Sequence, residues 1–243
     1  FPRGFVCPSC GDRQAPWRSG TGLLACIACR SPHRTTFGTL FDGSLRPLSR
    51  WFRTLWEVTA REDAVGPITL QRTLGTRDPR QARRVLESIR ALMAVPAREP
   101  LAGDVQMAIS RLDVDGLDGR AAVGVVLQSA GGDRSRIRLR HLERLTPQSI
   151  VEFAHETVAI RSRIRTQPWA GFSPLSASGY DHRIQPMAEG DVQQVMSLIK
   201  LWLWSSARVR PADLDARLQE FGFRYNRRSY PPGLLFYRLL TLA

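Results

Sequence analysis

Apolar positions between residues 47 and 93 recur every three or four residues, which is the spacing of amphipathic helices. The first run predicts a helix whose aromatic face belongs to the core: Leu48, Trp51, Phe52, Leu55, Trp56 and Val58. A short helix is predicted over residues 67–74, followed by a turn at Gly75 and Thr76. A longer helix is predicted over residues 78–93, where Asp78 can cap its start. Helix, short helix, glycine turn and longer helix is the order of a helix-turn-helix DNA-binding unit.

The longest of these helices has one apolar and one basic face. Its apolar stripe is Ala82, Val85, Leu86, Ile89, Leu92 and Met93. The opposite face carries Arg77, Arg80, Gln81, Arg84 and Ser88, mostly near the N-terminal end, where a recognition helix contacts bases in the major groove. We expect Arg80, Gln81 and Arg84 to face bases and Arg77 to contact phosphate. The alternative is an ordinary solvated basic face.

The pattern changes after residues 95–104, a segment rich in proline and glycine that predicts a linker. Three stretches then run apolar or alternate as strands do: residues 105–110, 121–128 and 136–141. Later segments predict a helix, a short strand and two more helices: residues 147–158, the region of Ile164, and residues 192–204 and 211–221. Three strands, a helix, a strand and further helices is the order of an RNase H-like α/β domain, although a generic α/β domain gives a similar pattern.

Charge indicates the kind of partner. The 243 residues include 35 Lys+Arg against 22 Asp+Glu, a formal net charge of +13. The sequence pI is near 11.1, which points to a polyanion, most often nucleic acid, with a membrane surface as the rival partner. No stretch has the 18 or so apolar residues of a membrane span, and the N-terminal residues lack the pattern of a signal peptide. We therefore expect a cytoplasmic protein, located at the bacterial nucleoid.

All four cysteines lie in the first 30 residues, as two CxxC pairs separated by fifteen residues: Cys7, Cys10, Cys26 and Cys29. This spacing is typical of a zinc ribbon, in which four thiolates complete a tetrahedral shell around one ion. Such a zinc ion is structural, because no coordination position is left for water. Two disulfides or free buried thiols are the alternatives. Nearby Arg30, His33 and Arg34 are expected either to contact DNA phosphates or to form a solvated rim.

Four segments resemble a known family along nearly the whole chain: GFVCPSCGDR, CIACRSPHRTTFGTLFDGSLRPLSRWFRTLWEVT, LQRTLG and LQEFGFRYNRR. They are similar to zinc-ribbon insertion-sequence transposases of bacteria. The resemblance implies a zinc ribbon at residues 1–45, a helix-turn-helix at 46–95 and an RNase H-like domain at 96–243. In that family, two aspartates and a third polar ligand bind two divalent metals for strand transfer, and the two ions clamp the attacking and leaving oxygens.

The resemblance places Ala108, Gln167 and Leu198 where those three ligands belong. Alanine and leucine offer no donor atom, and a neutral glutamine offers one weak oxygen, so the chain is expected to be catalytically inactive. Nearby acids are poor substitutes. Asp104 lies roughly 13 Å from Ala108 along a strand, and Asp191 lies roughly 10 Å from Leu198 along a helix. A further acidic group resembles a solvated loop: Asp113, Asp115 and Asp118.

The sequence thus favours a sequence-specific, double-stranded DNA-binding protein derived from a transposase. We expect it to act as a transcriptional regulator or chromosome-organising factor, to form a homodimer, and to use neither a membrane nor a small-molecule substrate. Further DNA contacts are expected on the former active-site face: Lys200, Arg224, Arg227 and Arg228. Two alternatives remain, an active transposase with a displaced metal site and a protein–protein docking module.

Overall fold

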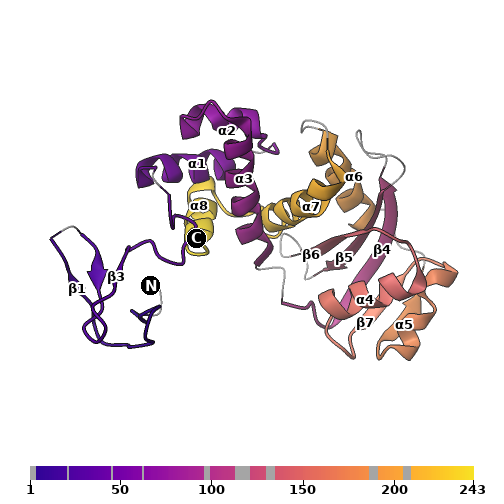
Figure 1. Cartoon of the computed structure of the whole chain (residues 1–243). Helices are drawn as coiled ribbons and strands as arrows, with labels where there is room; N and C mark the ends of the chain where they lie inside the picture. The colour runs from indigo at the N-terminus through magenta and orange to yellow at the C-terminus, as the bar shows by residue number, and fades with distance from the viewer. Residues whose placement is uncertain are drawn as a thin grey trace.

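The structure, a computed structural model, is a mixed α/β protein with two sheets (Figure 1). It describes residues 4–20, 22–44, 46–61, 63–95, 99–112, 121–129, 135–185, 191–204 and 209–243. The acidic residues Asp113, Asp115 and Asp118 lie outside the described residues, as does the side chain of Asp191. Among the helices of the described part, none is long and apolar enough to span a membrane.

The N-terminal segment forms a small three-stranded antiparallel sheet. Its strands are β1 (Trp17–Arg18), β2 (Leu24–Ala25) and β3 (Pro32–His33), in the order β1-β2-β3. Each strand has only two residues, so the ladder alone provides few hydrogen bonds. A segment this small needs another source of stability, such as a metal site.

Three helices follow: α1 (Leu48–Ala60), α2 (Pro67–Leu74) and α3 (Pro79–Ala94). Gly75 ends α2 in the left-handed conformation, with φ 64°, which glycine adopts without steric cost. Asp78 begins α3 by accepting a hydrogen bond from the backbone N–H of Arg80. The chain between α2 and α3 therefore turns sharply, as the sequence predicts.

The helical unit is completed by residues from the other end of the chain. Helix α8 (Pro232–Leu240) packs on α1. Leu235 and Leu239 from α8 enter the same buried cluster as the apolar faces of α1, α2 and α3. Trp56 of α1 lies edge-on to Phe236, with ring centroids 5.8 Å apart. Figure 1 shows α8 lying beside α1, on the side of the helical unit that faces the ribbon.

The second sheet has five strands in the order β6-β5-β4-β7-β8. The first three strands in sequence, β4 (Asp104–Leu112), β5 (Ala121–Gln128) and β6 (Arg136–Leu142), pair antiparallel. Strand β7 (Arg163–Thr166) then pairs parallel with β4, and β8 (Asp181–Ile184) pairs parallel with β7. The central position of β4 follows from this crossover.

Helices cover both faces of this sheet. Helix α4 (Pro147–Thr157) and the short α5 (Pro174–Ala177) pack on one face, with a 3₁₀ turn (Ala170–Phe172) between them. Helices α6 (Asp191–Trp204) and α7 (Pro211–Tyr225) cover the other. Alternate residues of β5 enter the two cores, as expected for a strand buried on both faces.

A buried ion network joins the helical unit to the sheet unit. Glu220 of α7 is fully buried and accepts hydrogen bonds from two arginines. Arg90 of α3 donates through Nε over 2.8 Å, and Arg224 of α7 donates over 3.1 Å. Arg90 also donates to the backbone carbonyl of Val65, and Arg224 to that of Arg61. One carboxylate therefore holds α3, α7 and the end of α1 together.

Candidate zinc centre and nucleic-acid interface

The four cysteines lie together at one end of the ribbon. Their sulfur atoms are all within 4.8 Å of one another. Cys7 Sγ lies 3.5 Å from Cys29 Sγ, and Cys10 Sγ lies 3.7 Å from Cys26 Sγ. Tetrahedral zinc with Zn–S bonds of about 2.3 Å separates its sulfur ligands by about 3.8 Å. The cluster therefore fits one metal ion, and its four sulfur donors suit zinc.

The two CxxC segments have the same backbone geometry. In the first, the N–H of Gly11 donates to the carbonyl of Cys7 over 2.9 Å; in the second, Arg30 donates to Cys26 over 3.0 Å. The equivalent residues both have positive φ, 76° for Gly11 and 60° for Arg30. A non-glycine residue is strained in this region. The predicted DNA-contact residue Arg30 therefore also occupies a position that favours glycine.

The metal-free thiols differ in acidity. Hydrogen bonds from Ser31 lower the pKa of Cys29 to about 6. A backbone hydrogen bond from Asp12 acts to lower the pKa of Cys10, but burial and the neighbouring thiols outweigh it and raise the pKa to about 12. Four thiols this close cannot all ionise without a cation between them. Zinc binding must therefore release protons.

His33 is a neighbour of this cluster that sequence reasoning misplaced on a basic rim. It is buried, and its Nε2 lies 3.5 Å from Cys7 Sγ. The rings of Phe5 and Phe37 flank it, with centroids 6.2 and 5.7 Å away. This packing makes His33 a positioning residue for Cys7. Phe37, four residues after His33, and Phe5, two residues before Cys7, were the sequence signal that could have placed His33 in an aromatic, buried setting.

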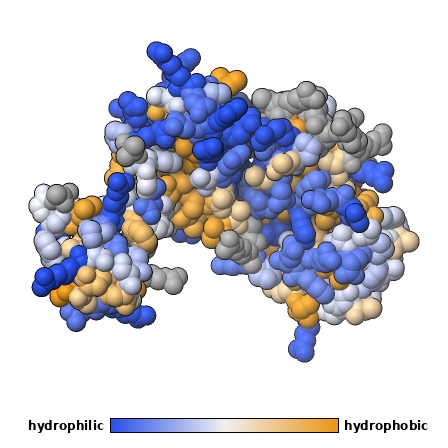
Figure 2. Space-filling model, viewed as in Figure 1, coloured by the Kyte–Doolittle hydropathy of each residue, from blue (hydrophilic) through white to orange (hydrophobic). Residues whose placement is uncertain are grey.

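Helix α3 presents its basic face to solvent. Arg77, Arg80, Gln81 and Arg84 are all exposed, and Figure 2 shows hydrophilic side chains over α2 and α3 on the upper side of the helical unit. Within the described part of the chain, none of the three guanidinium groups forms an ion pair. The Gln81 carbonyl differs, because Thr76 donates to it over 2.8 Å and Arg46 also donates to it. Gln81 is therefore held in place before any ligand binds.

The DNA-contact residues predicted in the C-terminal part of the chain differ in how far their side chains are already engaged within the protein. Lys200 is exposed on α6. Arg224 is not free, because its side chain is only 12% exposed and binds Glu220, and its guanidinium lies 5.1 Å from the Trp202 ring centroid. Arg228 lies 4.4 Å over the ring of Tyr225. Together with Arg227 and Leu198, Arg224 and Arg228 line a cleft of about 1140 Å³ between α1, α6 and α7.

The three positions that the resemblance assigns to metal ligands lie on elements that pack together. Ala108 is half-buried on β4 against the α6–α7 core. Gln167 follows Thr166, which pairs with Met107, so Gln167 comes at the level of Ala108 on the neighbouring strand. Leu198 is 40% exposed on α6, which packs on β4 and β5. None of the three side chains is a carboxylate.

Asp104, on the same strand as Ala108, is engaged elsewhere. Asp104 accepts a hydrogen bond from Arg165 Nε over 2.7 Å. Apart from the cysteine cluster, no group of three or more His, Cys, Asp or Glu side chains within the described ranges converges on one point.

Comparisons with known proteins add little. No protein-family model and no curated protein matches the sequence. Among solved structures, the chain is similar to a chain in the cryo-electron microscopy structure of the simian T-cell lymphotropic virus intasome in complex with PP2A regulatory subunit B56 gamma, with 13% sequence identity and a TM-score of 0.37. The match covers 65% of this chain and 64% of that chain, so this chain spans less than two thirds of its length. A likeness this distant assigns no function.

Proposed function

We propose that the chain is a sequence-specific double-stranded DNA-binding protein that retains the architecture of a zinc-ribbon transposase without its catalytic site. The observation that carries this proposal is the basic face of α3. Arg77, Arg80 and Arg84 are exposed at the N-terminal half of a helix that follows a short helix and a glycine turn. This is the geometry with which a recognition helix enters the major groove.

The overall charge supports the same partner. A formal net charge of +13 attracts a polyanion and makes binding depend on salt. The ribbon adds Arg30 and Arg34, both exposed, which can contact phosphates beside the site read by α3. Phosphate contacts fix the position of a protein on the duplex, whereas base contacts select the sequence.

The second sheet supports descent from an RNase H-like enzyme. Its strand order β6-β5-β4-β7-β8, with antiparallel first strands and a parallel crossover to β7, is the order expected for that fold. Two-metal phosphoryl transfer needs several anionic ligands converging on ions about 3.5–4 Å apart. Ala108, Gln167 and Leu198 do not provide them, which supports a role in binding without strand cleavage. As a regulator or chromosome-organising factor, the protein would act at the bacterial nucleoid as a homodimer.

Selection of preferred duplexes from a random pool, followed by fluorescence anisotropy, tests the reading helix. Replacing Arg80 or Arg84 with alanine should reduce discrimination between the selected duplex and a scrambled one by about 5- to 150-fold, which corresponds to about 1–3 kcal/mol. Replacing Arg77 should weaken binding to both duplexes equally and lower the salt slope by about 1.

Arg183→Ala is the matched control, because it removes the same charge on β8 at the far edge of the sheet. It should leave discrimination unchanged. If Arg80→Ala and Arg84→Ala both discriminate as the parent does, α3 is not the reading element.

A docking role is the second candidate, and one observation favours it. Leu198, Leu201 and Trp204 are 40%, 62% and 69% exposed along one side of α6.

Incubation of the protein with its selected duplex and Mg²⁺ or Mn²⁺ separates the remaining alternative: metal-dependent nicking would restore an active transposase with a displaced site.

A further inference from the structure

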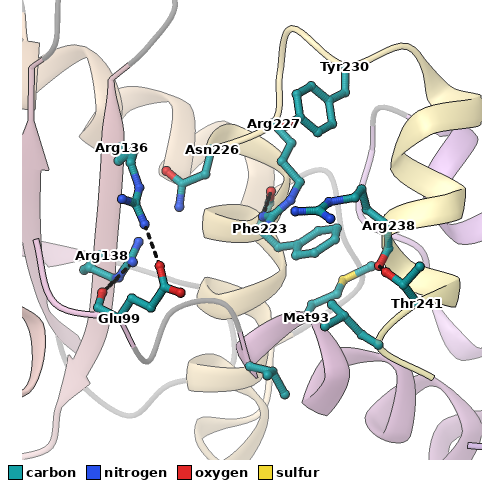
Figure 3. A pocket seen from close by; sticks show the side chains of 12 residues that line it. Met93, Glu99, Arg136, Arg138, Phe223, Asn226, Arg227, Tyr230, Arg238 and Thr241 are labelled. Atoms are coloured by element: carbon teal, nitrogen blue, oxygen red, sulfur yellow. Dashed lines mark hydrogen bonds and ion pairs between the residues drawn. The ribbon is translucent and has the colours of Figure 1, made fainter. Parts of the chain in front are cut away.

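A second cavity lies where the helical unit meets the sheet unit, and it is strongly cationic. Its volume is about 490 Å³. The C-terminal end of α3, the start of β6, the end of α7 and helix α8 all contribute to its wall. Figure 3 shows Arg136 and Arg138 entering from β6, while Arg227 and Arg238 extend toward each other from the opposite side. Four arginines therefore line one cavity, against the single carboxylate of Glu99.

Two of these arginines are fixed by the protein. Arg138 is buried, and its guanidinium donates to the backbone carbonyls of Glu99, over 2.6 Å, and of Ile137, over 3.0 Å. Arg227 donates to the carbonyl of Phe223 over 3.1 Å and lies 4.2 Å over the Phe223 ring. Fixed guanidinium groups lose little conformational entropy when an anion binds.

The other two arginines are held weakly or not at all. Arg136 approaches the Glu99 carboxylate at 3.6 Å, but the two side chains are 43% and 82% exposed, so this ion pair is weak. The exposed Arg238 guanidinium forms no ion pair with another described residue. Both groups therefore keep donors for a ligand.

The arginines repel one another. Burial lowers the pKa of Arg138 to about 10, and the charges of Arg136 and Arg227 contribute. Burial likewise lowers the pKa of Arg227, and the charges of Arg238 and Arg136 add to this effect. Like charges brought this close destabilise the protonated forms, so an anion between them removes a cost that the free protein carries.

We propose that this cavity binds a phosphorylated small anion. A guanidinium group can bind two phosphate oxygens through two parallel hydrogen bonds. An ammonium group lacks this planar, two-pronged geometry and acts as a point charge. The volume lies within the usual range for small-molecule sites, about 300–1000 Å³. The exposed ring of Tyr230 in the wall suits a phosphorylated ligand that also has a planar group, such as a mononucleotide.

The position of the cavity separates it from the proposed DNA-reading face. Met93, which lines the cavity, lies thirteen residues after Arg80 on the same helix, a separation of roughly 20 Å at 1.5 Å per residue. The ligand instead contacts α3 and α8 on one side and β6 and α7 on the other. Its binding stabilises the association of the helical and sheet units, which makes it an effector site.

Calorimetric titration and thermal unfolding of the full chain test this proposal with three probes: inorganic phosphate, inorganic pyrophosphate and adenosine 5′-monophosphate. Sodium chloride at equal ionic strength is the control. We expect the unfolding midpoint to rise with the logarithm of probe concentration, as it does for a ligand that binds only the folded state. A shift no larger than that in sodium chloride would overturn the proposal.

Two variants locate the effect. Arg238→Gln should weaken binding at least tenfold while leaving the midpoint without ligand unchanged or slightly higher, because it removes repulsion toward Arg227. Arg183→Gln, outside the cavity, should bind as the parent does. A loss of folding in Arg238→Gln would shift the test to Arg136→Gln, because among the described residues the Arg136 side chain forms an ion pair with the exposed Glu99 alone.

The phosphate has two possible sources, a free small ligand or the DNA backbone, and a DNA arm separates them. The selected duplex should bind Arg238→Gln as well as it binds the parent, and should not displace adenosine 5′-monophosphate. If the duplex competes with the probe and loses affinity in Arg238→Gln, the cavity is a DNA phosphate contact and the effector proposal fails. The Arg80 variants report independently on DNA reading, so failure of one proposal leaves the other measurable.

Discussion

Removal of the Glu220 carboxylate should destabilise the protein severely. Glu220 is fully buried, with 0% of its surface exposed. Its carboxylate accepts hydrogen bonds from Arg90 at 2.8 Å and from Arg224 at 3.1 Å. Its replacement by alanine leaves two guanidinium groups at the junction of α3 and α7 without their anion. Breaking a buried ion pair by deleting one partner costs about 3–5 kcal/mol, mainly because the remaining charge stays buried.

The magnitude should lie at the upper end of that range, because one deletion affects two cations. Glu220→Gln keeps the volume and one acceptor oxygen, so its cost should be smaller. A double variant, Arg90→Met with Glu220→Leu, removes a cation together with the anion and should recover part of the loss, since well-packed apolar replacements of buried ion pairs are often neutral.

Urea unfolding followed by circular dichroism gives the free energy of unfolding for each variant, and the slope with urea tests whether the unfolding remains two-state. Glu57→Ala is the matched control, because the Glu57–Arg61 pair is exposed and should contribute less than about 1 kcal/mol. A Glu220→Ala variant that loses no more stability than this control would refute the assignment of the network as the main junction between the two units.

Three further changes have defined outcomes. Elemental analysis should find one zinc per chain, and Cys26→Ser or a chelator should make residues 4–44 sensitive to limited proteolysis. Zinc affinity should fall on acidification, because the thiols must lose their protons to bind zinc as thiolates. Gly124→Ala should cost about 1–3 kcal/mol in urea unfolding, because the added Cβ would lie 2.6 Å from Cε1 of the buried Phe153. Arg30→Gly should raise the zinc affinity of the ribbon slightly, because glycine relieves the strain of a positive φ, while weakening DNA binding if Arg30 contacts phosphate.

The helices were predictable because local signals mark their ends. Asp78 and Pro79 fix the start of α3. The helix is predicted over residues 78–93 and is Pro79–Ala94 in the structure, a difference of one residue at each end. The mixed α/β class and the gathering of the four cysteines are confirmed. Spacing sufficed for the cysteines, because a CxxC segment brings two thiols together through local backbone geometry.

The missed elements lack such signals. Strand β8 is short and carries no buried residue, since it lies at the edge of the sheet, so it has no apolar alternation to detect. Helix α8 is apolar over much of its surface, and no element is predicted over its residues. Arg224 is predicted to contact DNA because its segment matches the family and would line the former active-site face, and that prediction does not include its pairing with Glu220. Its buried partner Glu220 is local, but Arg90 lies 130 residues earlier, and no local pattern reports such a pairing.

The packing of α8 on α1 also has a consequence for the order of events during synthesis. Leu235 and Leu239 belong to the core of the helical unit, yet Pro232 is made 172 residues after Ala60 ends α1. At 5–20 residues per second, the ribosome needs roughly 10–30 seconds to add that stretch. During this interval α1 lacks α8, and the part of its apolar face that α8 covers stays open to solvent or to a chaperone. The helical unit therefore finishes folding only after the sheet unit has been translated.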